Sequence, residues 1–173
     1  GGTLSAAPNF AYELCVRRIE EKDLEGIDLS SWRGAFNGAE AVSPVIIRKF
    51  IERFADYGFR SETMMPVYGL AESSVGLAFP TQDRGPLFDR VSRKDLMGRG
   101  QAVTVDNENV EGVEVVSCGI PLPGHQIRVV DNRGSELPER RVGRVQFMGP
   151  STTSGYFMNP EESARLFQDN WLD

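Results

Sequence analysis

Two short segments of this sequence join small residues to polar ones directly after runs that predict buried strands. The first is Phe-Asn-Gly-Ala-Glu at residues 36–40, and the second is Tyr-Gly-Leu-Ala-Glu-Ser at residues 68–73. Ligands of open α/β sheets bind beyond the carboxyl ends of the strands, where loops of this kind lie. Small residues let a flat base approach the backbone, Tyr68 could stack on that base, and Glu72 is a hard oxygen ligand suited to Mg²⁺. Residue chemistry alone still favours a simpler interpretation: two tight strand–helix turns, with Tyr68 buried and Glu72 capping a helix.

The first half of the chain would position both segments, and its pattern alternates between helix and strand. Ser43 followed by Pro44 predicts a helix start, because a hydroxyl can cap the first turn and proline suits the first helical position. The expected elements are a helix over residues 8–19, a strand over residues 32–36, the helix from residue 43 and a strand over residues 64–67. This alternation predicts α/β layering up to about Pro80.

The second half has a different character. Residues 81–111 are polar and show no sustained periodicity. Residues 113–117, 126–130 and 143–148 predict short strands, separated by turns rich in proline, glycine, asparagine and aspartate. A last helix is expected after Asn159, a capping residue followed by proline and two acids. The expected fold class is therefore α/β: a mixed, layered sheet in the first half and a small β-rich part, a sheet or a distorted barrel, in the second.

Composition limits the choice of partners. The chain has 25 acidic residues against 19 lysines and arginines, a formal net charge of −6, and its basic residues are scattered singly. This argues against nucleic acid or an anionic membrane as the main partner. No apolar run approaches the ~20 residues of a membrane span, and no signal peptide is recognisable. Cys15 and Cys118 are expected to be free thiols rather than a disulfide, so a cytoplasmic location is predicted.

Four motifs, in order, resemble those of the adenylate-forming enzymes. This superfamily includes acyl-CoA synthetases, peptide-synthetase adenylation domains and luciferases. Asn-Gly-Ala-Glu at residues 37–40 and Tyr-Gly-Leu-Ala-Glu at residues 68–72 match two nucleotide motifs in order and spacing. Residues 149–156, which begin with Gly-Pro-Ser and end in Gly-Tyr, resemble the next motif. Trp-Leu-Asp at residues 171–173 resembles the run that leads into Thr-Gly-Asp, so the sequence is identified as a member of this superfamily.

Further residues are similar to one branch of the superfamily, the fatty acyl-AMP ligases. Pro-Asn-Phe-Ala-Tyr at residues 8–12, Val-Ser-Cys-Gly at 116–119 and Pro-Leu-Pro-Gly at 121–124 resemble that branch. Ala71 stands where the wider superfamily usually has threonine, as is typical of the branch. The polar stretch of residues 88–112 falls where these ligases carry an insertion.

The resemblance implies a role for each matched residue. The residues expected to bind the nucleotide are Gly38, Ala39, Glu40, Tyr68, Gly69, Leu70, Ala71 and Glu72. Tyr68 would stack on adenine, and Ala71 would lie near the α-phosphate. Glu72 is the expected catalytic residue, because it would coordinate Mg²⁺ and so help to neutralise the phosphates. The implied cofactors are thus ATP or AMP and Mg²⁺.

Three more residues have alternative interpretations. By resemblance, Asn9 and Phe10 would lie near the acyl channel, although Phe10 at helical spacing also fits a core position. His125 is the only histidine. It lies in a proline–glycine turn, and an exposed turn residue is favoured over a general base.

The resemblance also implies a domain plan and a reaction. Residues 1–80 would belong to an α/β nucleotide-binding subdomain, residues 81–112 to the insertion and residues 113–173 to a β-rich subdomain. The parent enzyme would join a fatty acid to ATP, release pyrophosphate and pass the acyl group to the phosphopantetheine thiol of an acyl carrier protein. The phosphate loop, the Thr-Gly-Asp motif and the small carboxyl-terminal domain would lie outside this sequence, so an inactive internal fragment is expected.

Two other functions stay open on the sequence. An acyl-CoA synthetase or another adenylation domain would share the scaffold, and Ala71 and the polar stretch argue for the AMP ligase. A non-catalytic binding module with an adenylation-like core belongs to another class, and it is the alternative if Gly1 is a natural start.

Overall fold

The computed structural model describes residues 2–106, 111–168 and 171–172. Residues 107–110 of the expected insertion and Asp173 of the last motif lie outside the described residues. The chain divides into two compact units. Unit 1 comprises Gly1–Gly69, Ala78–Asp89 and Val115–Ile120, and unit 2 comprises Leu70–Leu77, Arg90–Glu114 and Pro121–Asp173.

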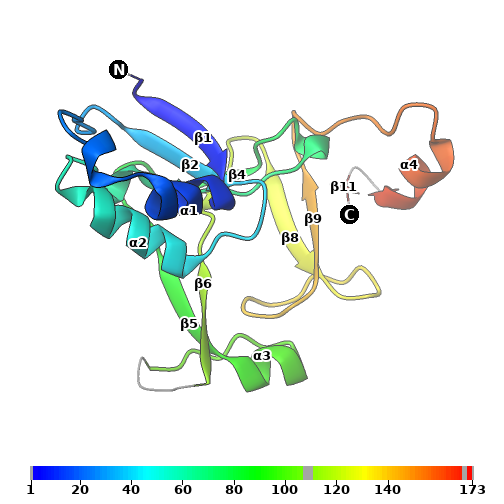
Figure 1. Ribbon diagram of the computed structural model, residues 1–173. Coiled ribbons are helices and arrows are strands. Elements are labelled where there is room, and N and C mark those ends of the chain that lie inside the picture. The colour runs from blue at the N-terminus through cyan, green and yellow to red at the C-terminus, as the bar shows by residue number, and fades with distance from the viewer. Residues whose placement is uncertain (1, 107–110, 169–170, 173) are drawn as a thin grey trace. The chain divides into compact units, whose positions relative to one another are not determined.

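A parallel sheet of three strands is the framework of unit 1. Its order is β1 (Leu4–Pro8), β2 (Gly34–Gly38) and β3 (Met64–Pro66). Helix α1 (Asn9–Arg18) lies between β1 and β2 in the chain, and α2 (Pro44–Ala55) lies between β2 and β3. The two helices pack side by side, as Figure 1 shows. Because the strands are parallel, the segments that follow them emerge at one edge of the sheet, with Gly38 opposite Pro8 and Asn37 opposite Pro66.

The core of unit 1 forms where the apolar face of α2 meets α1 and the sheet. Ser43 caps α2 as expected, since its side chain accepts a hydrogen bond from the Ile46 N–H at 3.4 Å. Phe50 of α2 packs edge-on against Tyr12 of α1, with ring centroids 5.1 Å apart. Burial raises the pKa of Tyr12 to about 12, and its hydroxyl donates to the Phe36 carbonyl at 2.9 Å. The buried apolar residues of this core are Tyr12, Leu24, Ala35, Ile47, Phe50, Phe54, Phe59 and Met64.

Unit 1 differs from the sequence prediction at its beginning. Strand β1 was not predicted, because its small residues (Leu-Ser-Ala-Ala-Pro) show no apolar run and its partner lies about 30 positions later in β2. Pro8 therefore ends a strand and precedes α1 instead of lying within the helix. The predicted strand at residues 32–36 is displaced to Gly34–Gly38, since Trp32 lies in the preceding turn and donates through Nε1 to the Gly34 carbonyl at 3.1 Å.

Unit 2 is built on an antiparallel sheet. Strands β8 (Gln126–Val130) and β9 (Arg144–Met148) pair along five residues each, and the sheet continues through β11 (Trp171–Leu172) to β10 (Phe167–Gln168). Leu77, Phe147 and Leu172 form its buried core. Helix α4 (Pro160–Leu166) is capped by Asn159, whose side chain accepts from the Glu162 N–H at 3.3 Å, as the sequence predicts. Among the described residues this sheet is open, with β8 and β10 at its edges, so the expected barrel-like closure is wrong.

The polar stretch has regular structure that its sequence did not predict. Strand β5 (Phe88–Ser92) pairs with β6 (Gly112–Val116), and α3 (Arg93–Arg99) lies between them in the chain. The Ser92 side chain caps α3 by accepting from the Asp95 N–H at 3.2 Å, and Gly100 ends it with a φ of 60°. A helix of seven residues is too short for its periodicity to stand out in a sequence.

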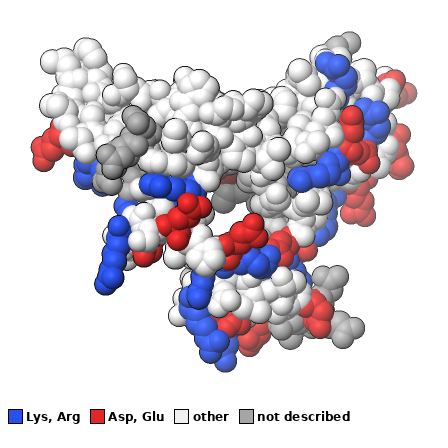
Figure 2. All heavy atoms as spheres, turned by 180° about the vertical axis from the view of Figure 1, so that it is seen from behind, with Lys and Arg blue, Asp and Glu red and all other residues white. Residues whose placement is uncertain are grey.

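Short elements complete the structure. They are three 3₁₀ turns, η1 (Glu21–Asp23), η2 (Ser61–Thr63) and η3 (Ala71–Ser73), and a two-stranded sheet of β4 (Ala78–Phe79) and β7 (Ile120–Pro121). Cys15 and Cys118 are free thiols, as predicted. In the part of the chain that the structure describes, every helix is too short or too polar to cross a membrane. On the face drawn in Figure 2, lysine and arginine side chains lie among acidic ones without a broad basic patch.

Candidate functional site

The end of β2 lies against the segment that follows β3, so unit 1 brings the start of both predicted segments together. The Val67 N–H donates to the Asn37 carbonyl at 2.8 Å. A Cβ atom on Gly38 would lie 2.8 Å from Val67 Cγ2 and 3.0 Å from the Val67 carbonyl oxygen. Only glycine permits this approach without displacing the backbone. The close contact at Gly38 is thus made with the segment after β3, and the approach of a flat base to these small residues stays a prediction.

Tyr68 follows that contact and has a fixed backbone with an accessible ring. Its N–H donates to the Ala78 carbonyl at 3.0 Å, and its carbonyl accepts from the Ala78 N–H at 2.9 Å. The residue is 39% exposed. The interpretation in which Tyr68 is a buried core residue is therefore wrong, and the ring is available to a flat ligand.

Glu40 has a structural contact that the sequence did not reveal. Ala39 adopts a φ of 66°, in the left-handed region that few non-glycine residues occupy. After this turn, Oε1 of Glu40 accepts a hydrogen bond from the Phe10 N–H at 2.6 Å, in the first turn of α1. A carboxylate there pairs with an otherwise unsatisfied N–H and with the positive end of the helix. The Glu40 carboxylate is thus engaged by α1.

Asn9 and Phe10, the residues expected near an acyl channel, behave differently from each other. Asn9 is only 8% exposed, and its Oδ1 accepts from Asn37 Nδ2 at 3.4 Å and from the Ser43 N–H at 3.1 Å. It therefore links α1, β2 and the cap of α2. Phe10 is 53% exposed, so it is not the core residue that its spacing would allow. The acyl-channel role stays a prediction for both.

Glu72 lies in unit 2, because the boundary between the units falls between Gly69 and Leu70. It is the middle residue of η3, a turn in which the Ser73 hydroxyl accepts from the Leu70 N–H at 3.4 Å, so Glu72 is not itself the helix cap that residue chemistry alone favoured. Residues 149–156, the third motif, lie along this turn. The Glu72 carbonyl accepts from the Thr153 N–H at 2.8 Å, and the Tyr156 hydroxyl donates to Glu72 Oε1.

Two serines add to the contact between η3 and the third motif. Ser151 Oγ donates to the Ser73 carbonyl at 2.9 Å, and Ser74 Oγ donates to the Ser151 carbonyl at 3.0 Å. Both bonds join residues more than 70 positions apart in the chain. The turn that carries Glu72 is therefore held on its backbone as well as at its carboxylate.

His125 supports the same contact, although it was predicted to be an exposed turn residue. Its Nε2 lies 2.7 Å from Ser151 Oγ, and its ring packs so closely on Gly149 that an added Cβ there would lie 2.2 Å from Cδ2. The other ring nitrogen, Nδ1, lies 3.3 Å from the Pro123 carbonyl oxygen, so both nitrogens of the ring have a polar partner. This residue could not be connected to Glu72 from sequence, since 53 positions separate them.

The Glu72 carboxylate raises the pKa of Tyr156 through the hydrogen bond between them, so the phenol stays a neutral donor at physiological pH. Among the described residues, no group of three or more histidine, cysteine, aspartate or glutamate side chains could hold a metal ion. A single carboxylate nevertheless fits Mg²⁺, which takes one or two carboxylates together with substrate phosphates and water. The residues present are thus compatible with a nucleotide-bound cation at Glu72.

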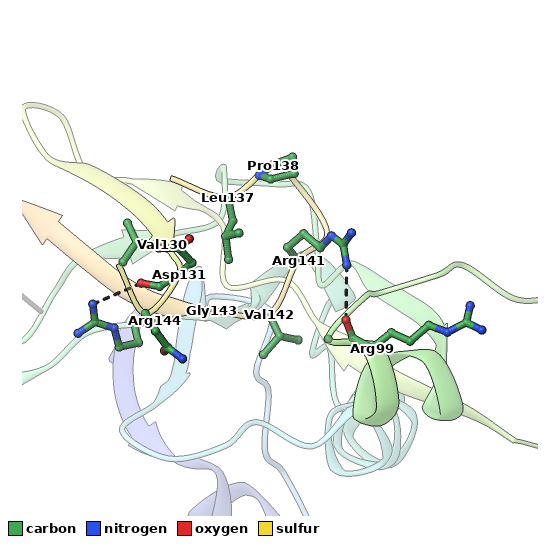
Figure 3. Close-up of a pocket in the computed structure, with 11 residues that line it drawn as sticks. Arg99, Val130, Asp131, Leu137, Pro138, Arg141, Val142, Gly143 and Arg144 are labelled. Carbon is green, nitrogen blue, oxygen red and sulfur yellow. Dashed lines mark hydrogen bonds between the residues drawn. The ribbon is translucent and has the colours of Figure 1, made fainter. Parts of the chain in front are cut away.

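A separate hollow in unit 2 contains none of the predicted site residues. Its volume is about 550 Å³, and it lies between α3 and the turn after β8 (Figure 3). The guanidinium of Arg141 donates to the Arg99 carbonyl and that of Arg144 to the Asp131 carbonyl, each at 3.4 Å. These two arginines of its lining are thus bonded to the backbone around the hollow.

Comparison with known proteins agrees with the motifs. A family model described as "AMP-binding enzyme" matches residues 3–157. A Caulobacter vibrioides protein named as an acyl-CoA synthetase is 37% identical over 99% of this chain. A long-chain-fatty-acid–AMP ligase of Mycobacterium tuberculosis is 36% identical over the whole chain. The chain spans about 30% of the length of each of these two relatives.

A solved structure from a study of fatty acyl-adenylate ligases of E. coli and L. pneumophila has the same fold. It superposes with a TM-score of 0.94 at 40% identity, covering 99% of this chain and 31% of the other. The chain belongs to the AMP-binding enzyme family, and its fold is that of part of an adenylate-forming enzyme. Within the family, its similarity to fatty acid–AMP ligases confirms the resemblance drawn from the motifs.

Proposed function

We propose that the full-length gene product containing this chain activates a fatty acid by adenylation. A carboxylate oxygen of the fatty acid attacks the α-phosphorus of ATP, the bond from that phosphorus to the bridging oxygen breaks, and pyrophosphate leaves. The observation that carries the proposal is the state of the segment Tyr68–Glu72 in a chain of the AMP-binding family. Tyr68 is exposed, and the Glu72 carboxylate is held by a hydrogen bond from Tyr156.

The protein's part in such a displacement is to orient groups and to balance charge. Gly38, Ala39 and Glu40 would line the adenine site through their backbone, and Tyr68 would stack on the base. Gly69, Leu70 and Ala71 would form the turn beside the α-phosphate.

Mg²⁺, when bound, would neutralise phosphate charge, and Glu72 is the residue of this chain that would hold it. Asn9, as a fixed link between α1 and β2, and Phe10, as an exposed ring, would border the acyl chain. Because ATP and reduced cysteines are typical of the cytoplasm, we also propose that the enzyme is located there.

We further propose that the acyl group passes to the thiol of an acyl carrier protein. The support is the similarity to fatty acid–AMP ligases and Ala71 in place of a threonine. The competing acceptor is coenzyme A, which the Caulobacter relative's name favours.

Two assays on the full-length gene product test these proposals. Fatty-acid-dependent exchange between ATP and labelled pyrophosphate tests adenylation, and its absence would favour a non-catalytic binding module. Transfer of a labelled acyl group to a phosphopantetheinylated carrier protein is then compared with transfer to coenzyme A. Efficient thioester formation with coenzyme A would make the protein an acyl-CoA synthetase.

The structure sharpens a third test, removal of the polar stretch. Deletion from Phe88 would remove a ring that packs against the unit 1 core and lies 3.9 Å from the Arg48 guanidinium. Replacing only residues 93–111 with a short turn would keep β5 and β6, which pair with each other. If the stretch disfavours coenzyme A, this variant should use it better than the parent, and unchanged use would contradict that role.

A further inference from the structure

The third motif holds the side chain of Glu72 as well as the backbone around it. In the part of the chain that the structure describes, the Tyr156 hydroxyl is the one side-chain group that bonds to the Glu72 carboxylate. The bond is made to Oε1. The second carboxylate oxygen, Oε2, has no hydrogen bond to the described residues, and it is not one of their buried oxygens that lack a partner, so a ligand can reach it.

Tyr156 is itself anchored to α4. Its N–H donates to Ser163 Oγ at 2.8 Å, and Ser163 Oγ donates to the Asn159 carbonyl at 2.7 Å. The preceding Gly155 has a φ of 143°, and an added Cβ there would lie 3.0 Å from the same Ser163 Oγ. A continuous set of contacts therefore runs from the first turn of α4 through Tyr156 to the carboxylate.

The geometry points to Tyr156 as a positioning residue for the metal-binding carboxylate: its hydroxyl holds Oε1 of Glu72 and leaves Oε2 to a divalent cation. This inference rests on the proposed function. Tyr156 touches neither nucleotide nor fatty acid in this role, because it acts through Glu72 alone.

A free glutamate on a three-residue turn would have to give up side-chain rotamer freedom each time a cation binds. A hydrogen bond to one oxygen removes that freedom in advance, and such outer contacts orient metal ligands in many proteins. Losing one typically weakens metal affinity by about 10–100-fold. The same hydrogen bond could instead weaken metal binding, if the hydroxyl competed with the cation for the carboxylate.

Tyr156→Phe in the full-length gene product tests the inference, because it removes one hydroxyl and keeps the ring. Mn²⁺ binding in the presence of a non-hydrolysable ATP analogue, measured by electron paramagnetic resonance, is the readout. We expect about tenfold weaker Mn²⁺ affinity. Nucleotide affinity without metal should stay unchanged.

The chain offers a matched control. Tyr57 donates its hydroxyl to Glu21 Oε2 at 2.6 Å in unit 1, and that bond likewise raises the pKa of the phenol. Tyr57→Phe removes the same kind of bond away from both predicted segments, so Mn²⁺ affinity should match the parent. The inference would be overturned if Tyr156→Phe bound Mn²⁺ as tightly as Tyr57→Phe, or more tightly. Tighter binding would mean that the Tyr156 hydroxyl competes with the cation for the carboxylate.

Glu72→Gln separates this inference from the proposed function. If Glu72→Gln loses Mn²⁺ affinity while Tyr156→Phe does not, the metal role of Glu72 stands and the positioning role of Tyr156 fails. If Glu72→Gln keeps full affinity, the metal role itself fails. Adding Tyr156→Phe to Glu72→Gln should have no further effect on affinity, because the bond it removes serves only the carboxylate.

Ser163→Ala gives a second route should Tyr156→Phe fold poorly, as judged by its melting temperature. It keeps the phenol and removes the acceptor of the Tyr156 N–H. We expect Mn²⁺ affinity to fall several-fold, less than for Tyr156→Phe. An unchanged affinity in this variant would break the proposed connection between α4 and Glu72.

Discussion

The turn after β2 in unit 1 and the turn η3 in unit 2 each carry a glutamate that the motifs predict to be a site residue, and the two turns are held by different interactions. After β2, Gly38 is pressed against Val67 inside a parallel sheet, and the Glu40 carboxylate caps α1. At η3, polar groups from residues 149–156 bind the backbone and carboxylate of a short turn. Close packing therefore shapes the first region, whereas hydrogen bonds from a distant part of the chain shape the second.

This difference sets what each region can tolerate. The first has no room for added atoms, but its glutamate makes a bond that a neutral amide could also make. The second has exposed positions around it, but its glutamate needs a charge if it is to hold a cation. A substitution that changes the charge of the glutamate but not its size should therefore have a larger effect in the second region. A substitution that adds size but no charge should have a larger effect in the first.

The largest effect is expected from changing charge alone. Glu72→Gln should lower fatty-acid-dependent ATP–pyrophosphate exchange by at least about 100-fold, or roughly 2.7 kcal/mol, because the amide cannot neutralise phosphate charge through a cation. Glu40→Gln is the matched control, since its amide oxygen can still accept from the Phe10 N–H. Equal losses in the two variants would contradict the comparison.

Removing an accessible ring should have the next largest effect. Tyr68→Ala should raise the KM for ATP by about 5- to 150-fold, the range expected for losing a base–aromatic stack worth ~1–3 kcal/mol. Tyr68→Phe keeps the stacking surface and should stay near the parent value. The KM of both variants is measured by steady-state ATP–pyrophosphate exchange at varied ATP concentration. An unchanged KM in Tyr68→Ala would contradict the stacking of Tyr68 on adenine.

Changing size alone should affect stability in the first region. Gly38→Ala places a Cβ within 3.0 Å of the Val67 carbonyl oxygen. We expect it to lower the free energy of unfolding by about 1–3 kcal/mol, a usual cost of overpacking. Gly98→Ala in α3 is the control, because nothing lies within 4 Å of its Cβ and alanine favours a helix. Denaturant unfolding of the full-length gene product measures both, and equal stabilities would show that the β2 turn can relax.

The smallest effect is expected where one of several hydrogen bonds is removed. Ser151→Ala loses the bonds to the Ser73 carbonyl and to His125, but Thr153 and Tyr156 still hold Glu72. We expect a loss of about 1 kcal/mol in stability and a fewfold decrease in exchange rate. Ser154→Ala, an exposed neighbour, should match the parent. A loss as large as that of Glu72→Gln would mean that Ser151 has a direct role.

Local patterns were sufficient to predict much of the framework. Helix α2 with its Ser43 cap, strand β8 and the cap of α4 follow from neighbouring residues, and the structure has them where they were expected. Strand β1 could not be predicted, because it is defined by its pairing with β2. Helix α3 could not be predicted either, because it is too short to show a helical period of apolar residues. The barrel-like closure, which the sheet of the described residues does not have, was a wrong prediction because no sequence pattern tells whether two edge strands meet.

By itself, the sequence determined the family and the residues to consider. The order and spacing of Asn-Gly-Ala-Glu, Tyr-Gly-Leu-Ala-Glu and Gly-Tyr are carried by the chain alone, and the family match confirms what they indicated. Only the tertiary structure decided how those residues are held: Glu40 by α1, and Glu72 by Tyr156, 84 positions away. The physical reason is that a hydrogen bond depends on a few ångströms of distance in space, which separation along the chain does not encode.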